Sequence, residues 1–423
     1  MKTGLFLRGI AALSVCLAVP SFAQDLPAAR PEQVGLSAER LTRLDQQVEA
    51  DIKAGRIPGA VVLLVRHGRV AHYSAFGMAD GATGRAMRRD DIFRIYSMTK
   101  PVVSVALLML LEEGKFQLSD PLEKYIPAFR GIQVYAGTDA NGAMVLEDAK
   151  RAPTIQDAMR HTAGFANAGV RTPVDRRYLE LGISFTTLES LEQEMRLLGQ
   201  APLAYQPGEN WLYGKNHDVQ AYLVQQLSGM PLDRFLQERL FGPLGMKDTA
   251  YRLPDAKAGR TAEYGNAIAW PDPENPGLDM RPETYRRFAT RPFGTMGLWS
   301  TAMDYARFAQ MLLNGGELDG VRILSRKSVE LMTMNQLPPA IGDLTRTGRA
   351  GSGYGLGVSV AVDPARIGNL ISPGTFGWPG AATTTFLVDP QEGMVAIYMA
   401  QQWPYDARAL SEFQTLAYQA IAD

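Results

Sequence analysis

A serine and a lysine stand three positions apart at Ser97 and Lys100, within the tetrapeptide Ser-Met-Thr-Lys. On a helix, residues three apart lie one turn from each other on the same face, so the amine of Lys100 can reach the hydroxyl of Ser97. An ammonium there lowers the cost of forming an alkoxide, and a neutral amine can accept the hydroxyl proton. No other Ser-x-x-Lys occurs in the chain. The spacing therefore predicts a nucleophilic serine and its activating lysine.

The segments on either side of Ser97 predict how it is held. Residues 92–95 are strand-like, and residues 101–113 are strongly apolar and end before Gly114. This pattern predicts a buried helix whose first turn holds residues 98–101. The amides at a helix N-terminus favour developing negative charge, so a serine there is suited to nucleophilic attack. An N-capping serine with a solvated lysine would explain the tetrapeptide equally well.

Strand-like runs occur near both ends of the chain, with helical patterns between them. The N-terminal runs form a hairpin signal around residues 67–69, and a final helix is expected over residues 407–421. The predicted strands cover residues 60–65, 70–75, 354–362, 383–388 and 394–399. Together they predict an α/β (α+β) fold with one sheet built from both chain ends and a helical insertion.

Composition excludes several classes of function. The 423 residues include 43 basic and 44 acidic ones, which gives a formal net charge of -1 and no sign of a nucleic-acid partner. The sequence shows no Gly-x-Ser-x-Gly elbow, phosphate loop or dinucleotide fingerprint, and its four histidines show no metal-ligand spacing. We therefore expect no metal and no cofactor. The predicted nucleophilic serine instead indicates a small ester or amide as the substrate.

The first 23 residues have the features of a signal peptide. Lys2 and Arg8 precede an apolar stretch over residues 10–19 that is too short to span a bilayer, and cleavage is expected after Ala23. The only cysteine, Cys16, lies inside this segment, so the mature chain has no thiol nucleophile and no disulfide. We expect a secreted, periplasmic protein without a stable membrane span after processing.

The sequence around Ser97 resembles the nucleophile segment of the serine β-lactamase-like and penicillin-binding-protein superfamily. It is most similar to the family VIII carboxylesterases related to class C β-lactamases. The likeness extends in the family's order through residues 93–101, 118–127, 159–165 and 297–301, and it covers the chain from about residue 30 to the end. It implies an antiparallel sheet flanked by helices over about residues 30–130 and 295–423, and a helical subdomain over about 131–294. The whole hydrolase domain is expected over residues 24–423.

The resemblance also assigns a catalytic tyrosine to Tyr213. A phenol near ammonium groups loses its proton more easily, so Tyr213 would act as base for Ser97 and as acid for the leaving group. The alternative is a packed aromatic side chain on a loop. The β-lactamase pattern Tyr-x-Asn is broken here, because Lys215 takes the third position and Asn216 follows it. We interpret Lys215 as a solvated lysine rather than a second active-site charge.

The third family motif, normally Lys-Thr-Gly, is expected before the strand at residues 383–388. Lys-Thr-Gly at residues 2–4 lies in the leader, and Arg-Thr-Gly at residues 346–348 precedes the strand that the motif should follow. The matching position holds Trp-Pro-Gly at residues 378–380, close to the Trp-Gly-Gly common in the esterase branch.

The resemblance gives each residue of this third motif a role. Gly380 would let the backbone approach the substrate, and the amide of Ala381 would join that of Ser97 as an oxyanion hole. Trp378 would form an apolar wall that favours neutral esters, since the missing lysine removes a carboxylate-binding cation. The alternative for Trp378 is an ordinary core tryptophan.

These observations favour a serine carboxylesterase with an acyl-enzyme on Ser97. A β-lactamase and a D-amino-acid peptidase or amidase of the same fold remain alternatives, with weak β-lactamase activity open as a side reaction. A non-catalytic cell-envelope binding domain is a further alternative, since function resides in sites and not in the fold. The sequence leaves the physiological substrate and the oligomeric state open.

Overall fold

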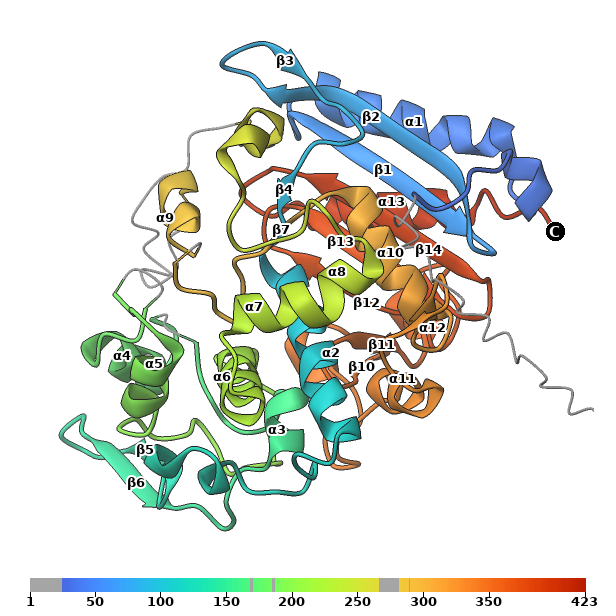
Figure 1. Ribbon diagram of the computed structural model, residues 1–423. Helices are drawn as coiled ribbons and strands as arrows, with labels where there is room; N and C mark the ends of the chain where they lie inside the picture. The colour runs from blue at the N-terminus through green and yellow to red at the C-terminus, as the bar shows by residue number, and fades with distance from the viewer. Residues whose placement is uncertain (1–24, 168–169, 185–186, 266–280, 289) are drawn as a thin grey trace, which may run out of the picture.

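The computed structural model describes residues 25–167, 170–184, 187–265, 281–288 and 290–423. The expected signal peptide therefore lies outside the described residues. The main feature is an eight-stranded antiparallel sheet in the order β10-β11-β12-β13-β14-β1-β2-β3 (Figure 1). Its strands are β1 (Gly59–Arg66), β2 (Arg69–Asp80), β3 (Arg85–Ala86), β10 (Ser352–Tyr354), β11 (Ser359–Ala361), β12 (Phe376–Gly380), β13 (Thr384–Asp389) and β14 (Met394–Ala400).

The two ends of the chain meet in the middle of this sheet. β1 pairs antiparallel with β14 over a register that runs from Ala60 opposite Ala400 to Arg66 opposite Met394. The predicted fold class is thereby confirmed. The expected single strand over residues 354–362 is wrong, because β10 and β11 are separate strands. Gly357, with φ +94° between them, lies where a side chain would overlap Ser104 Oγ.

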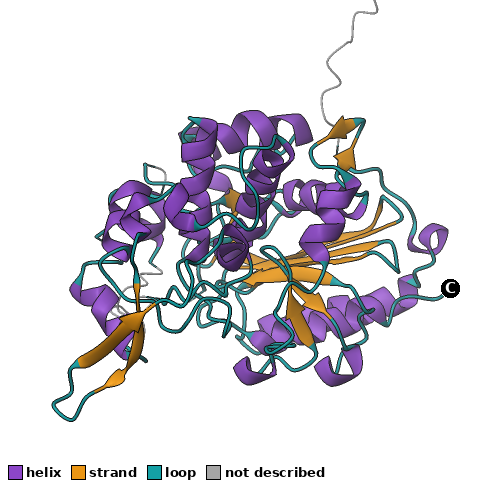
Figure 2. Cartoon of the chain, turned by 90° about the horizontal axis from the view of Figure 1, so that it is seen from below, coloured by secondary structure: helices purple, strands orange, loops and turns teal. Residues whose placement is uncertain are grey.

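Helices cover both faces of the sheet, which explains why every residue of β1 is buried. Successive residues of β1 point to opposite faces. Val61, Leu63 and Val65 belong to the larger core, which also holds residues of α10 (Ala302–Leu313). Ala60, Val62 and Leu64 pack into a second core with α1 (Ala38–Lys53) and α13 (Ala407–Tyr418), which Figure 2 shows as a separate layer.

The helix that follows the nucleophile is α2 (Thr99–Glu112). Its residues 99–110 are all buried, as expected for a helix that is apolar on every side. It packs against α6 (Asn216–Ser228) of the helical region, and both helices contribute to the larger core. The nucleophile segment thus lies where the sheet and the helical region meet.

The helical region also contains a β5–β6 hairpin that projects from it (Figure 2). No helix of the described residues is long and apolar enough to cross a membrane. The remaining helices and strands are β4 (Phe93–Arg94), β5 (Gln133–Thr138), β6 (Met144–Asp148), α3 (Ile155–Met159), α4 (Pro173–Glu180), α5 (Leu191–Leu198), α7 (Leu232–Leu236), α8 (Gly242–Leu244), α9 (Pro282–Arg287), β7 (Trp299–Ser300), β8 (Glu317–Leu318), β9 (Val321–Arg322), α11 (Arg326–Thr333) and α12 (Pro364–Ile367).

Candidate active site

Ser97 lies in a 3-10 turn, Tyr96–Met98, between β4 and α2. Tyr96 has φ +44°, a left-handed conformation that costs energy for a bulky residue. Tyr285 holds it there, since its hydroxyl accepts from the Tyr96 amide at 3.3 Å and the two rings pack edge to face at 4.6 Å. Of residues 91–100, all of them described, only Ser97 is partly exposed. The strained turn therefore presents the serine hydroxyl and buries its neighbours.

Two polar side chains converge on Ser97 Oγ. Lys100 Nζ donates to it at 3.0 Å, and the hydroxyl of Tyr213 donates to it at 2.8 Å. Lys100 is fully buried, and its amine also donates to the main-chain oxygen of Thr295 at 2.9 Å. The same amine lies 4.5 Å from the centre of the Tyr213 ring. The structure thus brings Ser97, Lys100 and Tyr213 together, and a phenol and an amine both lie within proton-transfer distance of one hydroxyl.

Aromatic side chains fix the position of Tyr213. Its hydroxyl accepts from Trp378 Nε1 at 3.2 Å, and its ring packs 5.0 Å from His161 and 6.1 Å from Trp211. Burial, together with the charge of Lys100, lowers the pKa of His161 well below its usual value, so this histidine is neutral. His161 is completely buried, and its Nδ1 bonds to the Asn216 side-chain amide at 2.9 Å.

The end of β12 lies against the Ser97 turn. A side chain at Gly380 would overlap the main-chain oxygen of Ile95 and the hydroxyl of Thr384, so the glycine is needed for this packing. Gly380 therefore allows close packing within the protein. The sequence had indicated only a close approach of its backbone to the substrate. Ala381 follows directly at this end of the strand and is partly exposed. Its role in an oxyanion hole stays a prediction.

Trp378 lies beside Tyr213 and is almost completely buried. Only 3% of its surface is exposed, and it packs edge to face against Tyr354 at 5.3 Å. Its role as an apolar wall for the substrate stays a prediction. Its observed polar contact is the hydrogen bond to Tyr213, which orients the phenol toward Ser97.

The structure also places Lys215 in a different environment from the solvated one that the sequence indicated. It is completely buried and lies 3.0 Å from Glu194 and 3.5 Å from Asp218, so it is not a solvated lysine. Burial alone would lower the pKa of Lys215, but the two carboxylates raise it above its usual value. Asp218 in turn accepts from the Thr295 amide at 2.8 Å, and the Thr295 carbonyl accepts from Lys100. Lys215 is thus linked to Lys100 through two intermediate residues.

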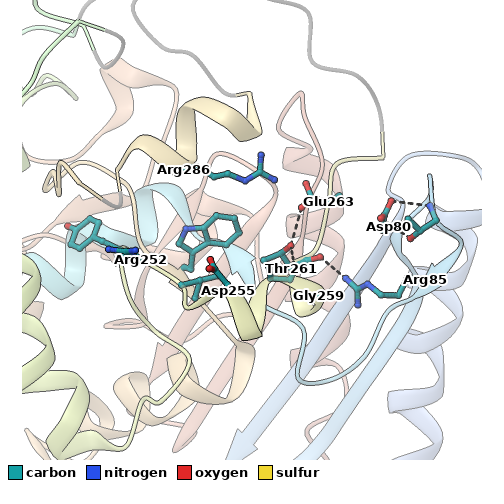
Figure 3. A pocket seen from close by; sticks show the side chains of 13 residues that line it. Asp80, Arg85, Arg252, Asp255, Gly259, Thr261, Glu263 and Arg286 are labelled. Carbon is teal, nitrogen blue, oxygen red and sulfur yellow. Dashed lines mark hydrogen bonds between the residues drawn. The ribbon is translucent and has the colours of Figure 1, made fainter.

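A separate hollow of about 550 Å³ lies outside this centre (Figure 3). Arg85 donates to the Thr261 carbonyl at its edge, and Trp299 forms part of its wall. None of its lining residues is one of the predicted site residues. Across the described part of the chain, no three His, Cys, Asp or Glu side chains lie together as a metal site would require.

Comparison with known proteins identifies the family of this chain. Residues 44–420 match the Beta-lactamase family. The chain belongs to that family. Protein Rv1367c of Mycobacterium tuberculosis is 34% identical over 83% of this chain and 87% of its own length. Esterase EstB of Burkholderia gladioli is 28% identical over 87% of this chain and 92% of its own length. The structure of EstCE1, a hydrolase with promiscuous acyltransferase activity, superposes with a TM-score of 0.75 at 26% identity, covering 90% of this chain and 99% of that one. The predicted superfamily is therefore confirmed.

The residues that sequence reasoning missed in this Beta-lactamase-family chain are those that support Lys100. Thr295 and Glu194 carry no recognisable motif, and each reaches the site only through the fold. The pair Lys215 and Asp218 did have a signal, because a spacing of three at the start of a helix brings the two side chains to one face. That signal predicts an ion pair but not its complete burial.

Proposed function

We propose that this member of the Beta-lactamase family is a serine carboxylesterase that forms an acyl-enzyme on Ser97. The observation that carries the proposal is the convergence of Lys100 Nζ and the Tyr213 hydroxyl on Ser97 Oγ at 3.0 and 2.8 Å. Similarity to a relative named as an esterase and to a hydrolase with acyltransferase activity supports the choice of acyl transfer to Ser97. The absence of lysine at position 378 supports esters over β-lactams.

The reaction proceeds in two acyl-transfer steps. Ser97 Oγ attacks the ester carbonyl while its proton passes to the pair formed by Lys100 and Tyr213, and the amides of Ser97 and Ala381 stabilise the oxyanion. The tetrahedral intermediate collapses, the C–O bond to the leaving alcohol breaks, and the alcohol takes that proton. Water then attacks the acyl-Ser97 ester and gives a proton to the pair. The bond between the acyl carbon and Ser97 Oγ breaks, Oγ takes the proton back from the pair, and the carboxylic acid leaves.

Covalent labelling tests the nucleophile directly. We expect a fluorophosphonate to add one phosphonyl group to the wild-type protein, located on Ser97 by intact-mass and peptide mass spectrometry, and none to Ser97→Ala. The same two proteins are then compared on short-chain p-nitrophenyl esters, cephalosporins and D-Ala peptides. Wild type should favour the esters. An unlabelled Ser97 would refute the proposal. Cephalosporin or D-Ala peptide turnover equal to that of the esters would replace it with a β-lactamase or peptidase activity of the same fold.

Replacing Tyr213 with phenylalanine tests the phenol. The ring and its packing against Lys100 and His161 remain, but the hydroxyl 2.8 Å from Ser97 is lost, so we expect kcat for p-nitrophenyl butyrate to fall about 10²-fold. Tyr135→Phe is the control, because that hydroxyl bonds Thr138 on the distant hairpin. Rates near normal in Tyr213→Phe would remove the tyrosine from proton transfer.

A further inference from the structure

The segment between α9 and β7 holds the carbonyl that contacts the amine of Lys100. Residues 293–298, all of them described, belong to no helix or strand, so no regular hydrogen-bond ladder fixes their main chain. At Thr295 the fixing group is the side chain of Asp218, whose Oδ1 accepts from the Thr295 amide at 2.8 Å. The carbonyl of Thr295 accepts from Lys100 Nζ at 2.9 Å. The position of this carbonyl therefore depends on Asp218.

The amine of Lys100 is placed by few contacts. A lysine stem is flexible, so its amine takes the position that its partners give it. Apart from Ser97 Oγ, the hydrogen-bond acceptor of this amine is the Thr295 carbonyl, and no described carboxylate forms an ion pair with it. Its other close neighbour is the Tyr213 ring at 4.5 Å. A shift of about 1 Å in such an arrangement can lower a rate about 10²-fold, because the reacting groups no longer align.

Asp218 is itself held by a buried cluster. Its side chain is completely buried at the start of α6, with Oδ2 3.5 Å from Lys215 Nζ. Glu194, from α5, lies 3.0 Å from the same amine. Burial and the neighbouring Asp218 raise the pKa of Glu194 to about 8, so at neutral pH Glu194 keeps its proton and the negative charge stays on Asp218. The Thr295 amide thus faces a carboxylate that is fixed in place.

We propose that Asp218 is a positioning residue for the reaction. It fixes the main chain of Thr295, whose carbonyl holds the amine of Lys100 beside Ser97 Oγ. This inference rests on the proposed function, because it requires Lys100 to exchange a proton with Ser97. It gives the buried cluster around Lys215 an effect on the rate in addition to its effect on stability.

Replacing Asp218 with leucine tests the hydrogen bond to Thr295. Leucine keeps most of the side-chain volume but accepts no hydrogen bond, and Lys215 keeps Glu194 as its partner. We expect kcat for p-nitrophenyl butyrate to fall about 10²-fold, with KM nearly unchanged because the substrate contacts stay the same. Labelling of Ser97 by the fluorophosphonate should slow with kcat, and thermal unfolding should show a native fold.

Asp218→Asn is the conservative variant that should restore the rate. The side-chain oxygen of asparagine can still accept from the Thr295 amide. Its NH₂ group can donate to Glu194, which then gives up its proton, so the total charge of the cluster stays the same. We expect kcat within about 5-fold of wild type, since a neutral hydrogen bond replaces a charged one.

Asp51→Leu is the matched control. Asp51 is also a buried aspartate, and its Oδ1 accepts from Gln47 at 2.8 Å, but it belongs to α1 on the other face of the sheet. We expect this variant to lose stability and to keep kcat. If Asp218→Leu does not fold, Asp218→Ser, whose short side chain cannot bridge to Thr295, is measured in its place.

Two results would overturn the role of Asp218 while the esterase stands. One is a normal kcat in Asp218→Leu, or in Asp218→Ser where that variant replaces it. The other is a loss in Asp218→Asn as large as in that variant, because the hydrogen bond to Thr295 would then not be the cause. If wild type hydrolyses no ester and the fluorophosphonate does not label Ser97, the esterase proposal fails, and this inference fails with it.

Discussion

We expect Lys100→Met to lower kcat for neutral esters about 10⁴-fold while the protein remains folded. The amine of Lys100 contacts Ser97 Oγ at 3.0 Å, and it also donates to the Thr295 carbonyl at 2.9 Å. Methionine keeps an unbranched apolar stem in this buried position but has no proton to give or take. The loss should therefore appear in kcat, measured with p-nitrophenyl butyrate across pH, and thermal unfolding should show a native fold.

The control for this variant is Lys124→Met. Lys124 is more than half exposed and pairs with Asp120 on the surface, so its loss should change neither kcat nor KM. A loss of only a few fold in Lys100→Met would mean that Tyr213 alone activates Ser97. The mechanism proposed above would then be wrong in the role it gives to the lysine.

Lys215→Met should lower the free energy of unfolding by about 3 to 5 kcal/mol, measured by chemical denaturation. The substitution leaves Glu194 and Asp218 buried without their cation. The double variant Lys215→Met/Glu194→Gln removes one of the two buried carboxyl groups that have lost their cation and should recover part of the lost stability. An unchanged stability in Lys215→Met would refute the structural role of this buried cluster.

The deficit of Lys215→Met should also depend on pH. Burial and the neighbouring Asp218 raise the pKa of Glu194 from its ordinary 4.5 to about 8, against the opposing effect of Lys215, and removal of the lysine raises it further. An acid whose pKa is raised in the folded state keeps a proton that the unfolded chain has lost. Stability therefore falls in both proteins as the pH rises from about 4.5, but in wild type this fall ends near pH 8, where Glu194 ionises, whereas in Lys215→Met it continues to higher pH. The deficit should therefore be larger at about pH 9.5 than at about pH 7.

Local patterns predicted much of the fold and part of the site. Alternating and apolar runs were sufficient to predict the central hairpin and one sheet built from both chain ends. The spacing of Ser97 and Lys100 was sufficient to predict their contact. Lys215 could not be placed from sequence, because its burial depends on Glu194 of another helix. The position of Arg349 could not be predicted from the sequence either. Its guanidinium stacks on Trp378, and only the folded sheet brings these two segments together.

The pairing of β1 with β14 has a consequence for the order of folding. Ala60 finds its partner only when Ala400 has been synthesised, and such distant contacts form slowly. The turn that carries Ser97 likewise meets β12 only when the C-terminal strands have formed. A partly made chain therefore holds Ser97 without the strand that lies against its turn.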